Sequence, residues 1–177
     1  MKRNKLDIGC GARPMTGKDW DCMDVRKEIP MFDHSVFYPN IVADVLEGIP
    51  REDGYYDEIK LSSMLEHFNK KEVHKVMSEC TRVLSPGGKI WISVPDMGLI
   101  ADRLFNANSD REVNHLINLV YGEHDYEENA HKWGYTEKSL RDLLAKYNFV
   151  NIARLESKQY ICELVLEGIY IKTKYTL

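Results

Sequence analysis

Long apolar stretches and paired cysteines are both missing from this sequence. No run of about 18 apolar residues occurs, so no transmembrane helix is expected. The first residues are basic, but Asp7 and a glycine turn follow at once, which leaves no apolar segment of signal-peptide length. The four cysteines form no Cys-x-x-Cys pair, so neither a zinc site nor a disulfide framework is indicated. Together these absences predict a cytoplasmic protein with reduced thiols.

An excess of basic residues is missing as well. The chain has 24 Lys and Arg against 28 Asp and Glu, which gives a net charge of −4. Non-specific nucleic-acid binding needs a basic surface, so bulk nucleic acid is not expected as a partner. With 177 residues, 44% of them apolar, and no internal repeat, the chain is predicted to form one domain over residues 1–177.

The first half of the chain has little room for helices between its strands. Apolar and β-branched residues predict strands at 5–8, 20–25, 41–45 and 57–62. The link at 12–19 holds Pro14 and Gly17 and is too short for a normal connecting helix. Residues 26–40 contain Pro30 and Pro39, so we expect this segment to be irregular.

Helices and strands alternate in the second half. Apolar residues at steps of three and four predict helices at 73–84 and 136–147, and capping-box spacing predicts another that starts at Ser109. Strands are predicted at 89–94, 149–155 and 162–171. The last two are joined by a link too short for a parallel crossover, so they should be antiparallel. The fold class is therefore α/β, with a mostly parallel sheet, an antiparallel C-terminal strand and reduced helices in the first half.

The shortage of helices should leave one face of the first half-sheet in need of another cover. An open apolar sheet face favours association. We therefore expect the apolar residues of the 26–40 segment to lie over the sheet or to form a subunit contact, and we predict a homodimer. These residues are Met31, Phe32, Val36, Phe37 and Tyr38.

Glycines and acids fall at the carboxyl ends of the predicted parallel strands, where α/β folds bind ligands. Residues 6–11 (LDIGCG) run from a strand into a glycine turn, which lets a ligand approach the backbone closely. The dinucleotide fingerprint G-x-G-x-x-G fails because Pro14 takes the third glycine position, which disfavours NAD and FAD. Asp24 and Asp44 end the next two strands, where a carboxylate can accept hydrogen bonds from a ribose or an adenine.

In this order, these motifs make the sequence similar to the class I S-adenosylmethionine-dependent methyltransferases. The resemblance covers at least residues 5–96 and includes YDEI at 56–59, MLEHF at 64–68 and RVLSPGGKIWISVPD at 82–96. A narrower likeness, carried by GARPMTGKDW at 11–20 and NAHK at 129–132, is to a compact subgroup of predicted methyltransferases with a type 11-like domain. The family implies a Rossmann-like sheet and S-adenosylmethionine as the cofactor.

The resemblance also implies a role for individual positions of the cofactor site. Asp24 holds the ribose hydroxyls, and Asp44 with Val45 holds the adenine. The implied contacts on the methionine side come from Asp7 and the backbone of Gly9, Cys10 and Gly11, with Ser62 beside the sulfonium. Because the sulfonium is already an activated leaving group, in-line placement of the acceptor does most of the chemical work.

A general base is needed only where the acceptor is a hydroxyl or a protonated amine, and histidine suits this task near pH 7. Of the six histidines, His67 follows the fourth strand beside the expected cofactor site, and His131 lies in the polar 122–135 loop. We take these two as candidate catalytic residues. For each, the competing interpretation is a structural histidine that fixes its loop.

A metal ion is the other possibility at the same place. Some ubiquinone-pathway O-methyltransferases carry a Glu-x-x-Glu-His set that ligates a divalent ion. Glu66 and His67 match this set, but Ser63 stands at the first Glu position. Loss of one carboxylate weakens a site for a hard cation, so we predict no metal.

The function predicted from the sequence is transfer of a methyl group from S-adenosylmethionine to an unidentified small polar or sugar-like acceptor. The 122–135 loop supports such an acceptor, because its aromatic rings and amide donors are the groups that sugars use. The alternative is a non-catalytic S-adenosylmethionine-binding or regulatory domain on the same fold, since helices that normally help to cover the cofactor are missing. A dehydrogenase is a distant third because of Pro14.

Overall fold

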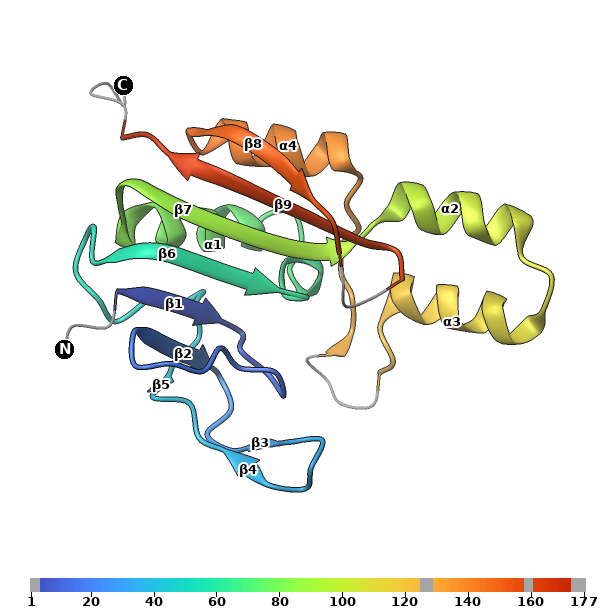
Figure 1. The fold of residues 1–177 in the computed structure, drawn as a ribbon, viewed down its shortest axis with the longest axis horizontal. Coiled ribbons are helices and arrows are strands. Elements are labelled where there is room, and N and C mark those ends of the chain that lie inside the picture. Colours follow the sequence, from blue (N-terminus) through green and yellow to red (C-terminus); the bar gives the residue numbers. More distant parts are fainter. Residues whose placement is uncertain (1–3, 125–128, 158–160, 173–177) are drawn as a thin grey trace.

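One seven-stranded sheet organises the molecule (Figure 1). The computed structural model describes residues 4–124, 129–157 and 161–172. The strand order is β5-β2-β1-β6-β7-β9-β8. All neighbouring pairs from β5 to β7 are parallel, whereas β9 is antiparallel to both β7 and β8. The strands are β1 (Lys5–Ile8), β2 (Trp20–Asp24), β5 (Ile41–Val42), β6 (Tyr56–Ser62), β7 (Leu84–Pro95), β8 (Phe149–Leu155) and β9 (Glu163–Tyr170).

This topology confirms the predicted fold class. The predicted antiparallel pairing of the last two strands is also present. Two boundaries differ from the prediction. Residues 84–88 already belong to strand β7 and form no separate turn, and the strand predicted at 41–45 is only β5 at 41–42, so Asp44 lies in the turn after it. No helix within the described ranges is long and apolar enough to cross a membrane.

The main hydrophobic core lies on one face of the sheet, under α1 (Glu72–Val83) and α4 (Glu137–Lys146). Figure 1 shows both helices behind the sheet. The buried side of α1 repeats at steps of three and four, as the sequence predicted. Thr136 caps α4 by accepting a hydrogen bond from the Ser139 amide, which fixes where that helix begins. The core-facing residues of α1 are Val73, Val76, Met77, Cys80 and Val83.

The opposite face carries charged residues and, within the described ranges, no helix packs over it in Figure 1. Alternate residues of the strands point to this side, and oppositely charged neighbours pair across them. Lys5 lies 3.0 Å from Glu58, and Lys89 lies 3.0 Å from Glu167. These charged side chains can face water, whereas in β2 the same face carries the buried Trp20 and Cys22, and Cys22 packs against Ile29 of the 26–40 segment.

The 26–40 segment forms a short hairpin, β3 (Ile29–Pro30) and β4 (Val36–Phe37), instead of an irregular loop. Phe37 packs against a small cluster with Cys10, Cys22 and Ile29. However, Phe32 is 73% exposed, and Val36 and Tyr38 are exposed too. Phe37 and Ile29 thus cover the outer side of β2 at Cys22, as predicted for this segment, while the use of its exposed residues as a subunit contact stays a prediction.

Two helices extend beyond the carboxyl ends of the strands: α2 (Met97–Asn106) and α3 (Asp110–Tyr121) (Figure 1). The predicted cap of α3 is confirmed, since Ser109 Oγ accepts from the Glu112 amide. Helix α2 was not predicted, and it begins where Asp96 accepts from the amides of Gly98 and Leu99. A short 3-10 turn, η1 (Leu65–His67), follows β6. Helix α3 and η1 together border the cavity described next.

Candidate active site

A cavity of about 640 Å³ opens at the carboxyl ends of β1, β2, β6 and β7. This volume lies within the usual range for small-molecule sites. Nine of the ten predicted site residues line it, although they come from segments far apart in the sequence. They are Gly9, Cys10, Gly11, Asp24, Asp44, Val45, Ser62, His67 and His131.

The glycine turn after β1 forms the floor of this cavity. Gly9 adopts a φ of 65°, and its amide donates to the Met23 carbonyl at 2.8 Å. A Cβ at Gly9 would come within 2.8 Å of Met64 Cγ, so both the backbone angle and the neighbouring side chain favour glycine here. The turn thus brings bare backbone to the cavity surface, as the sequence predicted.

Asp24 lies at the end of β2 with its carboxylate already engaged. It is buried, and it accepts hydrogen bonds from Gly11 N at 3.1 Å and from Arg26 Nε at 3.0 Å. Arg26 also lines the cavity, a position that no sequence motif indicated. A ribose that bonds to Asp24 must therefore share the carboxylate with this guanidinium or displace it.

Asp44, Val45 and Ser62 border the cavity in different ways. The exposed Asp44 accepts from the Leu46 amide at 2.8 Å, which shapes the turn after β5. Val45 is buried and gives this part of the wall an apolar surface. Ser62 ends β6, and its Oγ lies 3.3 Å from Ser93 Oγ. The three residues thus offer an acid, an apolar surface and a hydroxyl at one cavity.

Asp7 is the one predicted cofactor residue that does not line the cavity. Its buried carboxylate accepts from the Met15 amide at 2.8 Å and lies 3.9 Å from Lys60 Nζ. Burial raises the pKa of Asp7 to about 6, although Lys60 acts in the opposite direction. In the structure Asp7 supports the 12–16 loop from inside the protein.

Replacement of Asp7 by asparagine should flatten the pH dependence of stability. The pKa of Asp7 is about 6 in the folded protein, against 3.8 for an unperturbed aspartate carboxyl. Between these values the folded state holds a proton that the unfolded state has released, so wild-type stability falls as pH rises, by about 1.4 kcal/mol per unit at most. Urea unfolding at pH 4 and pH 7 measures the effect, and equal changes in the two proteins would contradict it.

His67 and His131 meet in the lining of the cavity. Their ring centroids are 4.8 Å apart and the rings are nearly perpendicular, at 83°. His67 Nδ1 lies 3.2 Å from the Ala130 carbonyl, and His131 Nδ1 lies 3.1 Å from the Leu119 carbonyl. Because a carbonyl can only accept, each Nδ1 carries the proton, and each Nε2 becomes the basic nitrogen.

Backbone hydrogen bonds hold the His131 segment against η1 and α3. The amides of Lys132 and Trp133 donate to the Glu66 carbonyl at 2.7 and 3.1 Å, and the His131 amide donates to the Tyr121 carbonyl at 2.9 Å. Gly122, with a φ of 80°, makes the approach possible, because a Cβ there would lie 1.9 Å from the Asn129 carbonyl oxygen. These backbone contacts therefore fix His131 next to His67.

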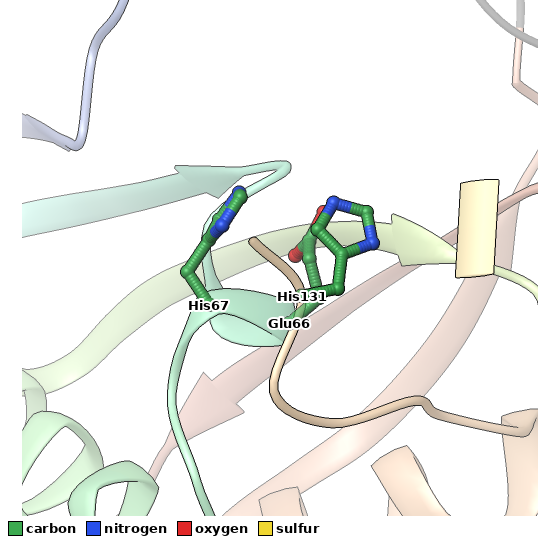
Figure 2. A group of neighbouring side chains, drawn as sticks. All are labelled: Glu66, His67 and His131. Carbon is green, nitrogen blue, oxygen red and sulfur yellow. The ribbon is translucent and has the colours of Figure 1, made fainter. Parts of the chain in front are cut away.

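Glu66, which the sequence offered only as part of an incomplete metal set, lies beside the two histidines. It is 1% exposed, and neither of its carboxylate oxygens has a hydrogen-bond partner among the described residues. Burial raises the pKa of Glu66 to about 8, and Glu163 adds to the rise. Burial, together with the neighbouring His67, lowers the pKa of His131 to about 4, so that imidazole is neutral at pH 7. Figure 2 shows the Glu66 carboxylate between the two imidazole rings.

The other aromatic, amide and histidine side chains differ in where they lie. In the polar 122–135 loop, Asn129 lines the cavity, Trp133 does not, and Tyr126 lies outside the described residues. His74 of α1 bonds through Nδ1 to the Tyr147 hydroxyl at 2.8 Å. His115 and Asn118 of α3 also line the cavity. Neither of these two had a predicted role, because their place follows from the packing of α3.

The parallel sheet with one reversed strand, and the cavity across its carboxyl edge, define a Rossmann-like methyltransferase. The sequence profile of the family described as "Methyltransferase domain" matches residues 2–154, and the chain belongs to this family. The class that the sequence motifs indicated is thereby confirmed. No curated protein sequence matches the chain.

Solved structures share the fold at low sequence identity. A SAM-dependent methyltransferase from Archaeoglobus fulgidus has a TM-score of 0.59 at 16% identity, over 94% of this chain and 86% of that one. The 1,6-didemethyltoxoflavin-N1-methyltransferase of Burkholderia thailandensis, solved with S-adenosylhomocysteine, has a TM-score of 0.60 at 17% identity, over 95% and 71%. Human N-acetylserotonin methyltransferase, in complex with SAM, has a TM-score of 0.63 at 15% identity, over 95% and 47%.

Proposed function

We propose that this protein transfers a methyl group from S-adenosylmethionine to a small polar or sugar-like acceptor. The observation that carries the proposal is the cavity itself, which joins the glycine turn and Asp24 to the histidine pair. Two of the similar structures hold S-adenosylhomocysteine or SAM, according to their descriptions. When bound, this cofactor supplies a methyl group on a sulfonium, so the protein has mainly to bind and orient.

Residues of the first three parallel strands bind the cofactor in this proposal. Asp24 accepts from the ribose hydroxyls, and Asp44 with Val45 borders the adenine. The glycine turn (Gly9, Cys10 and Gly11) and Ser62 surround the methionine end. Asp7 acts from behind the turn, because its carboxylate fixes the loop through Met15 and does not face the cavity.

His67 and His131 serve the acceptor. The neutral His131 can accept a hydrogen bond from an acceptor hydroxyl or amine through Nε2 and take its proton as the methyl group is transferred. His67 stands beside it and completes a polar wall with Asn129 and Asn118. Amide and imidazole groups bind hydroxyl-rich molecules well, which is the support for a small polar or sugar-like acceptor.

We also propose a cytoplasmic, single-domain protein that forms a homodimer. The four cysteines are all buried thiols, which supports a reducing compartment. One sheet takes strands from both halves of the chain, which supports one domain. The exposed Phe32, Val36 and Tyr38 on the β3–β4 hairpin support a subunit contact there, and light scattering at micromolar concentration tests it.

Calorimetry with S-adenosylhomocysteine and with NAD tests the cofactor. We expect saturable binding of the first and none of the second, and the reverse result would overturn the proposal. A screen for transfer of a tritiated methyl group to pooled sugars, polar metabolites and peptides then tests activity. Binding without transfer to any acceptor would favour a non-catalytic cofactor-binding domain.

A further inference from the structure

We propose that Glu66, His67 and His131 form a binding site for a divalent transition-metal ion of the zinc type. The three residues come from two segments, η1 and the 129–133 strip, that the fold brings together. Each offers one ligand atom, and these atoms lie within 4.8 Å of one another. Figure 2 shows that the three side chains converge on one region.

The donor set selects the kind of ion. Two imidazole nitrogens and one carboxylate oxygen suit Zn²⁺ and its neighbours in the first transition series. Mg²⁺ and Ca²⁺ prefer oxygen ligands and gain little from imidazole. In a tetrahedral zinc site the ligand atoms are about 3.3 Å apart, given bonds of about 2.0–2.1 Å, so a small closure of the three side chains suffices.

The hydrogen bonds of the two imidazoles match those of metal-binding histidines. Such a histidine usually donates its second ring N–H to a carbonyl or carboxylate, which fixes the tautomer and aims the other nitrogen at the ion. The Nδ1 atoms of His67 and His131 meet the carbonyls of Ala130 and Leu119 in this way. Nε2 is thus the ligand atom on each ring.

Glu66 provides a second, independent observation. Its side chain is fully buried and directed at the imidazoles, yet neither oxygen has a hydrogen-bond partner in the described part of the chain. A buried carboxylate left in this state is costly, and in native structures such a group has a specific cause. A cation bound between Glu66 and the histidines supplies the missing partner.

The site is also held in place before any ion binds. The Glu66 carbonyl accepts from two amides of the opposing strip, those of Lys132 and Trp133. This double link fixes the distance between the Glu66–His67 pair and His131. The sequence disfavoured a metal because Ser63 stands where the metal-binding set has its first Glu. In the structure the third ligand is His131, which comes from a distant loop.

The position of the site connects it with the proposed function, on which the next statement rests. All three residues line the same cavity as the glycine turn and Asp24. Three protein ligands leave coordination positions open, as in catalytic zinc sites. An acceptor oxygen or nitrogen bound there is held beside the sulfonium, so the histidines would then act on the acceptor through the ion and not by taking its proton directly.

Titration of the full chain, stripped with EDTA, with ZnCl₂ by calorimetry tests the site. We expect one ion per chain, and we expect Glu66→Gln, His67→Ala and His131→Ala each to weaken binding at least about tenfold. MgCl₂ should bind far more weakly. His115→Ala is the matched control, because this exposed histidine lines the same cavity but lies outside the cluster, and its zinc affinity should equal that of the wild type.

Cobalt provides a readout that does not depend on activity. Co²⁺ in the wild type should give a visible ligand-field spectrum that His131→Ala lacks and His115→Ala retains. No zinc binding by the wild type, or equal zinc affinity in the control and the three cluster variants, would overturn the metal site. S-adenosylhomocysteine binding, measured on the same samples, shows whether each variant is folded and whether the proposed cofactor function stands or fails separately.

Discussion

Replacement of His131 by alanine should lower the rate of methyl transfer by about 10²–10⁴-fold and leave the affinity for S-adenosylhomocysteine unchanged. The expected rate loss has a geometric reason, because His131 lines the acceptor end of the cavity and is fixed there through Tyr121 and Leu119. The cofactor should be unaffected, since its proposed contacts come from the other strands. The measurement combines initial rates with calorimetry, using the acceptor found in the screen.

A second histidine variant, at a position away from the cavity, serves as the matched control for His131→Ala. His34 is exposed at the tip of the β3–β4 hairpin and has a φ of 65°, a conformation that asparagine also adopts readily. His34→Asn should keep both rate and affinity. If His131→Ala lost rate and cofactor affinity in parallel, the damage would lie in the loop and the catalytic assignment would be wrong.

The pH profile adds a test of the same residue. Because burial and the neighbouring His67 lower the pKa of His131 to about 4, its imidazole should stay unprotonated well below the usual histidine range. The wild-type rate, measured on protein stripped of metal ions, should therefore hold between about pH 7.5 and about pH 5.5, where a histidine of pKa about 6.5 would already lose activity. A fall in rate centred near about pH 6.5 would contradict this assignment.

Replacement of Asp24 by alanine should weaken S-adenosylhomocysteine binding at least about tenfold. Hydrogen bonds from ribose hydroxyls to a buried carboxylate are charge-assisted and worth about 1.5–3 kcal/mol each, and about 1.4 kcal/mol corresponds to a factor of ten. Calorimetry gives the dissociation constant. Unchanged affinity in a folded Asp24→Ala protein would remove Asp24 from the site.

The surroundings of Asp24 decide which controls are needed. Its carboxylate also binds Gly11 N and Arg26, so alanine leaves these donors without an acceptor. Asp24→Asn keeps the size and one acceptor oxygen, and it should still bind more weakly than wild type because it lacks the charge. Asp33→Asn, at an exposed position outside the cavity, should bind normally.

The part of the cavity proposed for the cofactor could be predicted from the sequence because it depends on local rules. Parallel strands bring their carboxyl ends to one edge of the sheet, so the Gly9–Gly11 turn, Asp24 and Asp44 had to meet there. The role of Asp7 could not be predicted, since adjacent residues of a strand point to opposite faces and nothing local indicated the contact with Met15.

The acceptor side depends on long-range packing, which the sequence pattern does not encode. Glu66 and His131 meet only because α3 folds back and Gly122 lets the chain turn toward η1. Helix α2 was missed although Met97, Ile100 and Leu104 recur at helical spacing and pack in one cluster with α3. The polar nature of the open sheet face was readable in β6, since Glu58 and Lys60 alternate with the buried Ile59 and Leu61.

The open face also determines which substitutions this fold tolerates. Where helices cover a sheet, an outward position can be any apolar residue that fits the cover. Here the Lys60 Nζ lies over the Trp91 ring, at 5.6 Å from its centroid, and so covers part of this aromatic surface. A long charged side chain on this face thus covers apolar area that a helix covers on the other face. Its replacement by a short residue would be neutral on an ordinary surface but exposes aromatic area here.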